Sequence, residues 1–227
     1  MNSVSVVTID GPSGSGKGTI CQLLAKELGW HLLDSGALYR IVGLAAQRRG
    51  VPFDDEPALA DLAANLNVEF RPGESGEPSA VLLDGEDIGS EVRSETTGTL
   101  ASKVALHNAV RDALKSLQRS FAKAPGLVAD GRDMGTVIFT NAPVKIYLIA
   151  SAQERAERRY KQLITKGESV NLPALLEDIQ QRDERDMNRP IAPLKPADDA
   201  IVIDSTGTAI EDVFAQVLSQ VKAVIPS

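Results

Sequence analysis

The beginning of the chain joins an apolar run to a glycine-rich loop. Residues 4–10 are β-branched or apolar almost throughout, which is typical of a buried parallel strand. The loop that follows has the order Gly11, Pro12, Ser13, Gly14, Ser15, Gly16, Lys17, Gly18 and Thr19. Glycines allow backbone N–H groups to turn inward around an anion, and the helix that follows adds the positive end of its dipole. This pattern predicts a phosphate-binding loop, with Lys17 on the terminal phosphates.

The residue after the lysine departs from the usual pattern of such loops. Ser or Thr normally follows the Lys directly and binds Mg²⁺, whereas here Gly18 takes that place and Thr19 comes one position later. Thr19 is therefore only a candidate metal ligand. The alternative interpretation, a glycine-rich turn that binds nothing, is disfavoured because the spacing, the lysine and the strand–helix context agree. The loop does not identify the group that receives the phosphate.

Length and charge limit the classes of protein to which the chain can belong. A chain of 227 residues can bury one substantial core and carry a smaller insertion, so we expect an α/β domain with an inserted part. The net charge of −7 argues against a nucleic-acid or membrane partner. The single cysteine, Cys21, excludes an internal disulfide, and we expect it to pack in the first helix. No apolar run approaches 18 residues, so we expect a cytoplasmic protein.

The first half of the chain changes its hydrophobic period part-way along. Helices are predicted for residues 16–28, 35–50 and 57–66, with Leu23 on the buried stripe of the first, and a short strand for 30–33. Residues 68–70, 80–83 and 86–88 then alternate like antiparallel strands, with a polar turn at 72–78 and a hairpin turn at Asp84-Gly85. We place an insertion at about 60–105. Arg40, early in the second helix, is either a solvated charge or a contact to a second substrate.

In the second half, strands predicted for 127–130, 144–149 and 200–204 alternate with helices predicted for 110–121, 173–188 and 210–225. Arg111 lies beside the apolar stripe of the first of these helices. The strand at 127–130 ends in the charged run from Asp130 to Asp133. Ligands of open parallel sheets bind at the carboxyl ends of the strands, so we expect this run to line the ligand crevice.

Two helical patterns carry arginines. Arg155, Arg158 and Arg159 fall on one helix face, which is either a lid that closes over phosphates or a solvated basic face. Further on, an apolar stripe begins at Leu172 and continues as three charged residues, Arg182, Asp186 and Arg189. A face that changes from apolar to charged along its length leaves the core and enters a polar cleft.

Five segments together resemble the nucleoside monophosphate kinases and, within them, the bacterial cytidylate kinases. The segments are residues 11–19, 32–40, 130–137, 181–186 and 192–206, and the resemblance covers almost the whole chain. It implies transfer of the γ-phosphoryl group of Mg·ATP to CMP or dCMP. It also implies a P-loop parallel-sheet fold with a lid and a monophosphate-binding part that carries antiparallel strands. Separately, we expect a monomer. Thr140 and Asn141 depart from the family, which often has a proline there, so the shape of that loop stays open.

The resemblance also implies which residues form the site. ATP would lie on residues 11–19. The residues around CMP would be Ser35 beside the monophosphate, Arg40, Arg132 and Arg189 on phosphates, Ser102, Arg111 and Asp133 on cytosine, and Arg182 and Asp186 on the pentose. We expect the catalytic residues to be Lys17, Arg132, Arg158 and Arg189. Phosphates and water would hold most of the Mg²⁺ coordination, with Thr19 and Asp130 as candidate ligands.

The expected organisation is a single domain over residues 1–227. Its core would comprise 1–34, 106–150 and 190–227, its monophosphate-binding part about 35–105 and its lid about 153–170. Three other functions compete with this hypothesis: a kinase for a small acceptor such as shikimate or gluconate, a GTPase switch, and an ATP sensor without catalysis. The GTPase is disfavoured because the chain has no Asn-Lys-x-Asp stretch for guanine.

Overall fold

The structure is a computed structural model that describes residues 4–71, 80–165 and 167–225. The polar turn predicted at 72–78 lies outside the described residues. The described chain divides into two compact units, one comprising residues 1–34 and 119–227 and the other Ser35–Gln118. Within the described ranges, the helices are too short or too polar to cross a bilayer.

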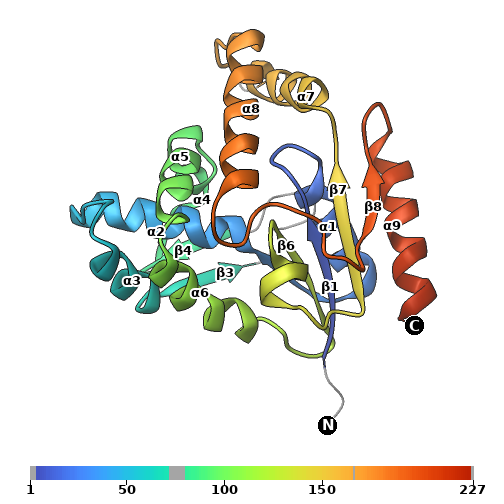
Figure 1. The fold of residues 1–227 in the computed structure, drawn as a ribbon, viewed down its shortest axis with the longest axis horizontal. Coiled ribbons are helices and arrows are strands. Elements are labelled where there is room, and N and C mark those ends of the chain that lie inside the picture. Colours follow the sequence, from blue (N-terminus) through green and yellow to red (C-terminus); the bar gives the residue numbers. More distant parts are fainter. Residues whose placement is uncertain (1–3, 72–79, 166, 226–227) are drawn as a thin grey trace. The chain divides into compact units, whose positions relative to one another are not determined.

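The first unit is built on a five-stranded parallel sheet with the order β2-β6-β1-β7-β8 (Figure 1). The strands are β1 Ser5–Asp10, β2 His31–Asp34, β6 Gly126–Gly131, β7 Val144–Ile149 and β8 Ile201–Asp204. β1 lies between β6 and β7, with Ile9 opposite Asp130 on one side and Ile146 on the other. The central strand therefore delivers the loop after Asp10 to the middle of the carboxyl edge. Parallel strands, as predicted, form this core.

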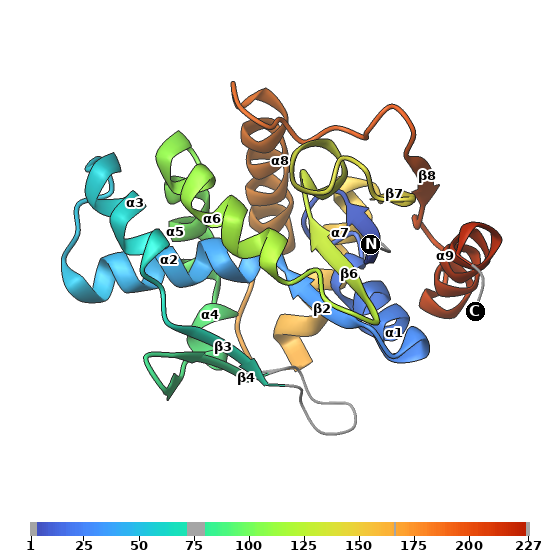
Figure 2. The same ribbon diagram turned by 90° about the horizontal axis from the view of Figure 1, so that it is seen from below.

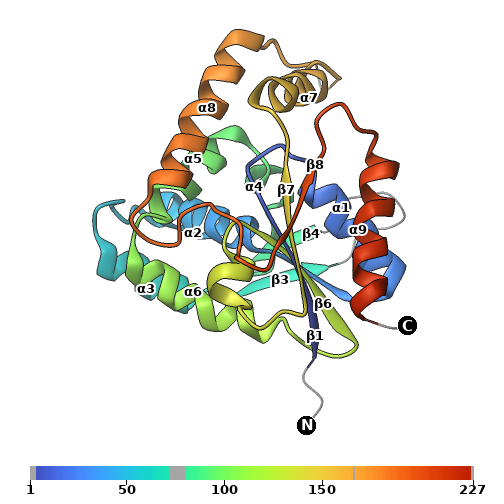
Figure 3. The ribbon, with the colours of Figure 1, turned by 45° about the vertical axis from the view of Figure 1, so that its right-hand side comes forward.

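Two helices cover the sheet with apolar side chains. α1 (Lys17–Leu28) and α9 (Ile210–Val224) pack with the sheet in one hydrophobic cluster that includes Ile20, Leu24 and Val217 (Figure 3). Cys21 is buried there, which confirms its packing role. The prediction for Leu23 was wrong, since it is 38% exposed. The buried face of α1 is centred on Ile20, Cys21 and Leu24, and Leu23 falls outside it.

The remaining helices of this unit follow the carboxyl ends of β6 and β7. A π-helical turn, η1 (Met134–Ile138), comes after β6, and α7 (Ala152–Thr165) comes after β7. α8 (Leu172–Asn188) packs against α7 and has no fully buried residue. The predicted stripe is nevertheless visible, because Leu172, Leu175, Leu176, Ile179, Arg182, Asp186 and Arg189 are all half-buried.

In the residues that the structure describes, the second unit combines five helices with a small antiparallel sheet (Figure 2). The helices are α2 Ser35–Arg49, α3 Glu56–Ala64, α4 Gly89–Val92, α5 Glu95–Val104 and α6 Asn108–Ser120. The strands are β3 Val68–Arg71, β4 Ala80–Leu83 and β5 Glu86–Asp87, in the order β3-β4-β5. The hairpin between β4 and β5 has φ of 53° at Asp84 and 86° at Gly85, the left-handed values that a tight hairpin turn requires. The antiparallel strands predicted for 68–70, 80–83 and 86–88 are confirmed.

Candidate functional site

The phosphate-binding loop runs from the end of β1 to the start of α1. Gly14 and Gly16 adopt left-handed backbone conformations, with φ of 80° and 95°. Residues with a side chain rarely tolerate such angles, so the two glycines permit a turn that other residues would strain. A chain of this shape turns successive N–H groups toward a common centre, where an anion can bind.

Lys17 is the buried cation of this loop. It is only 8% exposed, and its Nζ donates to Pro12 O at 2.9 Å, across the loop. Burial lowers the pKa of Lys17, and the nearby Arg132 lowers it further, while Asp130 and Asp10 act in the opposite direction. The ammonium group therefore lies within a compact set of charges at the carboxyl ends of β1 and β6.

Two aspartates of this set differ in how their carboxylates are satisfied. Burial raises the pKa of Asp130 to about 7, against the lowering effect of Lys17. Burial also raises the pKa of Asp10 to about 6, although its oxygens accept hydrogen bonds from Met134 N and Gly135 N, each at 2.8 Å. Asp10 thus holds the turn that follows Arg132 and Asp133, whereas Asp130 lies beside the lysine.

Candidate oxygen ligands for a metal ion lie near the first turn of α1. No group of three or more His, Cys, Asp or Glu side chains suitable for a metal occurs among the residues that the structure describes. A Cβ built on Gly18 would lie 3.5 Å from Asp130 Oδ2, so this carboxylate borders the first turn of α1, which also carries Thr19. One carboxylate and one hydroxyl fit Mg²⁺, because Mg²⁺ takes most of its remaining ligands from water and substrate phosphates.

A second group of charges forms around Asp186 of α8. Arg132 Nε donates to Asp186 Oδ2 at 2.5 Å. Burial disfavours the ionised form of Asp186, yet the guanidinium groups of Arg132, Arg182 and Arg189 outweigh it and hold its pKa below the usual range. The structure therefore brings together four residues that the sequence placed in two separate motifs. Asp133 is buried and close enough to Arg132 to raise the pKa of the arginine, together with Asp186 and Asp130 and against the effect of burial.

The arginines of α7 do not form one exposed face. Arg155 is 3% exposed, and its guanidinium donates to Ala150 O at 3.0 Å, to Ser13 O at 2.9 Å and to both carboxylate oxygens of Asp183. The interpretation of this residue as a solvated charge was wrong, because the phosphate-binding loop and α8 enclose it. The N–H groups of its guanidinium donate to backbone carbonyls and to a carboxylate of the protein itself.

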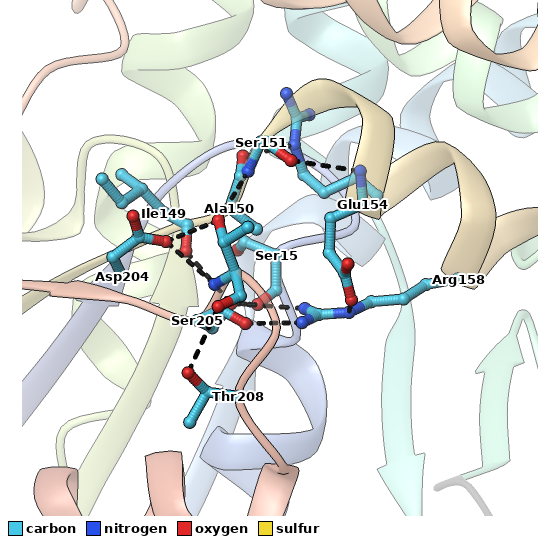
Figure 4. Close-up of polar contacts among 11 residues, drawn as sticks. Ser15, Ile149, Ala150, Ser151, Glu154, Arg158, Asp204, Ser205 and Thr208 are labelled. Carbon is cyan, nitrogen blue, oxygen red and sulfur yellow. Dashed lines mark hydrogen bonds and ion pairs between the residues drawn. The ribbon is translucent and has the colours of Figure 1, made fainter.

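Arg158 contacts the turn after β8 (Figure 4). Its Nη2 donates to Ser205 O at 2.6 Å and its Nη1 to Ser205 Oγ at 3.2 Å, while Nε donates to Glu154 Oε1 at 3.0 Å. Arg159 Nη1 donates to Gln162 Oε1 at 3.3 Å. The adjacent residues Arg158 and Arg159 thus have different acceptors.

Four predicted site residues belong to the second unit. Ser35 Oγ donates to Gln118 Oε1 at 2.8 Å, and Ser102 Oγ donates to Gly98 O at 3.2 Å. Arg40 Nη1 donates to Val92 O and Ser94 O, both at 2.8 Å, so it is not simply a solvated charge. Arg111 is buried and lies over the Tyr39 ring, 5.7 Å from the centroid.

The sequence matches a family model described as cytidylate kinase over residues 7–223. The chain belongs to the cytidylate kinase family. The cytidylate kinase of Shewanella denitrificans is 58% identical over 220 residues, which is 97% of each chain. That of Aeromonas hydrophila is 58% identical over 214 residues, covering 94% of this chain and 92% of the relative. The resemblance found from five short segments is therefore confirmed over nearly the whole length.

Solved structures of low sequence identity share the fold. A protein from Thermus thermophilus aligns over 100% of both chains with a TM-score of 0.51 and 17% identity. An uncharacterized protein from Eubacterium ventriosum aligns over 96% of this chain and 98% of its own, with a TM-score of 0.53 and 11% identity. At such identities the likeness concerns the architecture alone, and it agrees with the predicted fold class.

Sequence reasoning missed three residues around the phosphate-binding loop of this cytidylate kinase family member. Asp10 carried one local signal, since it ends the central strand just before the loop. Asp183 shares α8 with Asp186, but helical spacing does not reveal its partner. Ser205 lay within a segment that carried the resemblance, yet its hydrogen bonds to other segments leave no trace in the local pattern.

Proposed function

We propose that this chain transfers the γ-phosphoryl group of ATP to CMP or dCMP, giving ADP and CDP or dCDP. The observation that carries the proposal is the pair of adjoining charge groups in the first unit. Lys17 with its loop forms one, and Arg132, Arg182 and Arg189 around Asp186 form the other. Arg132 belongs to both, because it interacts with Lys17 as well as with Asp186. A reaction that joins two phosphate-bearing molecules needs such adjacent cationic groups.

The donor nucleotide is assigned to the loop at residues 11–19. Backbone N–H groups and the start of α1 would bind the phosphates of ATP, and Lys17 would leave Pro12 O to contact the terminal phosphates. A lysine that is already buried and partly desolvated interacts more strongly with a phosphate than a solvated one does. This supports Lys17 as a residue that acts on the transferring group.

The acceptor nucleotide is assigned to the residues that the resemblance implies. Arg40, Arg132 and Arg189 would bind phosphates, and Ser35 would lie beside the monophosphate. Ser102, Arg111 and Asp133 would contact cytosine, and Arg182 and Asp186 the pentose. The ionised form of Asp186, which the surrounding arginines favour, supports its role as a hydrogen-bond acceptor for a hydroxyl group.

The mechanism relies on positioning and charge neutralisation. Phosphoryl transfer needs little covalent help from the protein, so we assign no general base. Lys17, Arg132, Arg158 and Arg189 would offset the repulsion between the two polyanions as they approach. When Mg²⁺ is bound, with Thr19 and Asp130 as its candidate protein ligands, it supplies further positive charge to the phosphates. A lid at about 153–170 would exclude water and limit hydrolysis of ATP.

The experiment that tests this proposal is a panel of acceptors. Purified protein with Mg·ATP is given CMP, dCMP, UMP, AMP, shikimate and gluconate, and formation of ADP and of the phosphorylated product is measured. Rapid formation of CDP and dCDP supports the proposal. Faster phosphorylation of shikimate or gluconate would assign the chain to another acceptor, and ATP binding without any product would identify a sensor.

Two smaller parts of the proposal concern the state of the protein in the cell. We propose a monomer in the cytoplasm, in keeping with an acidic chain that contains a single, buried cysteine. Analytical ultracentrifugation with and without ATP and CMP tests the first part, and a sedimenting dimer would contradict it. Fractionation of cells that express the tagged chain tests the second.

A further inference from the structure

Two backbone carbonyls of the phosphate-binding loop are bound by side chains that lie far away in the sequence. Ser13 O accepts a hydrogen bond from Arg155 Nη1 at 2.9 Å. Ser15 O accepts one from Ser205 Oγ at 3.1 Å. Neither Arg155 nor Ser205 belongs to the loop motif, and neither is among the residues assigned to ATP or CMP above. Both contacts lie within the first unit.

Because the peptide bond is planar, these contacts also fix the direction of the N–H group that follows each carbonyl. In a trans peptide the C=O and the following N–H point in opposite directions. A Ser13 carbonyl that points to Arg155 therefore directs Gly14 N–H away from α7, and a Ser15 carbonyl that points to Ser205 directs Gly16 N–H away from the turn after β8. Gly14 and Gly16 are the loop residues with φ of 80° and 95°, where the chain curves around the anion position.

Both side chains are themselves held in place. The guanidinium of Arg155 is fixed by Ala150 O and by Asp183, and the residue is 3% exposed. Ser205 is 2% exposed, and its backbone N donates to Ile149 O at 2.8 Å. Arg158 donates to both oxygens of Ser205, so the single hydroxyl hydrogen faces Ser15 O at 3.1 Å and Ile149 O at 3.0 Å and is shared between them (Figure 4). Each contact to the loop is thus made by a rigid group.

We propose that Arg155 and Ser205 are positioning residues for ATP. They fix the peptide planes that follow Ser13 and Ser15, so that Gly14 N–H and Gly16 N–H face the phosphates before ATP arrives. Donors that are oriented in advance need not reorganise when the ligand binds, which favours binding and transfer. Neither residue touches the nucleotide. The inference rests on the ATP-dependent transfer proposed above.

The test compares KM for ATP with KM for CMP in two conservative variants. Arg155→Lys keeps a cation near Asp183 but loses the fork that reaches several acceptors, and Ser205→Ala removes only a hydroxyl. For each variant we expect KM for ATP and the Kd of ATP in calorimetry to rise about three- to tenfold, the effect of one lost hydrogen bond. KM for CMP should stay within about twofold of the wild-type value. Wild-type turnover of CMP in the same assay tests the proposed function separately.

Matched controls come from the same elements. Arg185→Met removes an exposed arginine of α8 whose Nε donates to Gln181 O of its own helix. Thr208→Ala removes a hydroxyl that donates to Thr206 O in the turn that carries Ser205. Both controls should leave the two KM values unchanged. If the Arg155 and Ser205 variants changed both KM values equally, or changed only the melting temperature, the positioning role would be overturned.

A double variant separates Ser205 from the arginine that contacts it. Since Arg158 donates to Ser205, the serine could act only by orienting Arg158. Ser205→Ala should still weaken ATP binding when it is combined with Arg158→Ala. Disappearance of its effect in that background would overturn the proposed direct hold of Ser205 on the loop.

Discussion

Two arginine–aspartate ion pairs involve α8. They have the same composition but differ in their exposure and in the other contacts of the arginine. Asp186 pairs with Arg132 from the end of β6, and Asp183, one turn earlier, pairs with Arg155 from α7. The side chain of Arg132 is 18% exposed and lies among Lys17, Asp130 and Asp133. The side chain of Arg155 is 3% exposed and donates to two backbone carbonyls as well.

The difference shows that the remaining contacts of an ion pair decide its role. Arg155 is enclosed by protein acceptors, so its pair ties α8 to the phosphate-binding loop. Arg132 is surrounded by other ionisable side chains, so its pair belongs to a group of charges that can act on phosphates. A buried ion pair by itself is weak support for stability, since desolvation offsets much of its attraction.

The largest effect on the reaction is expected from a substitution of Lys17, which lies near Arg132. Lys17→Ala removes a charge whose interaction with the phosphates strengthens in the transition state. We expect the rate of CDP formation to fall by about a hundredfold to a thousandfold, or about 2.7–4 kcal/mol, with the circular dichroism spectrum unchanged. Turnover close to that of the wild type would contradict the assignment of the loop.

A somewhat smaller effect is expected at Asp133, which shares a loop with Arg132. The wild type should prefer CMP over UMP and AMP by at least about a hundredfold in kcat/KM. UMP should be rejected because uracil lacks the exocyclic amine of cytosine around which the site is built. Asp133→Ala should lower the value for CMP far more than the value for UMP. Equal losses would mean that Asp133 acts on the phosphates or orients Arg132, and cytosine recognition would then fall to Ser102 and Arg111.

The two aspartates of α8 allow a matched comparison at a smaller scale. Asp186→Asn should raise KM for CMP by about tenfold and leave KM for ATP nearly unchanged, since it weakens a charge-assisted contact of Arg132. Asp183→Asn should act mainly on KM for ATP, through Arg155 and Ser13 O. Steady-state kinetics with each substrate varied in turn measure both. Identical profiles for the two variants would break the distinction between the pairs.

The smallest effect is expected in the contribution of the Arg132–Asp186 pair to the free energy of unfolding at acid pH. The pKa of Asp186 in the folded protein lies below its ordinary value of 3.8, so its ionised form stabilises the fold above about pH 4, and this contribution is lost as the pH falls through the folded pKa. Urea unfolding of the wild type and of Asp186→Asn at pH 5, 4 and 3 should show a difference in free energy of unfolding that shrinks with acid. A constant difference over this range would contradict the depressed pKa.

Local features of this chain could be predicted from its sequence because each depends on neighbouring residues. The apolar run at 4–10, the glycines before Lys17 and the Asp84-Gly85 turn act through backbone preferences and burial within a few residues. The stripe of α8 from Leu172 to Arg189 follows in the same way from the helical period. The family was recognised from five short segments of the same local kind, such as the glycine-rich loop at residues 11–19.

Contacts between distant segments were decided by the tertiary structure alone. Helical spacing places Arg155 and Arg158 on one face, yet only the packing of α7 against the loop and α8 buries one of them and turns the other to Ser205. Asp10 bonds to Met134 N across 124 positions, and Ser205 to Ser15 O across 190. The hydrogen-bond partner of each of these side chains is a backbone group, which nearly every residue carries, so the identity of the residue at the other end encodes nothing about the contact. Only the fold, which brings those backbone atoms within reach, decides which side chains hold the phosphate-binding loop.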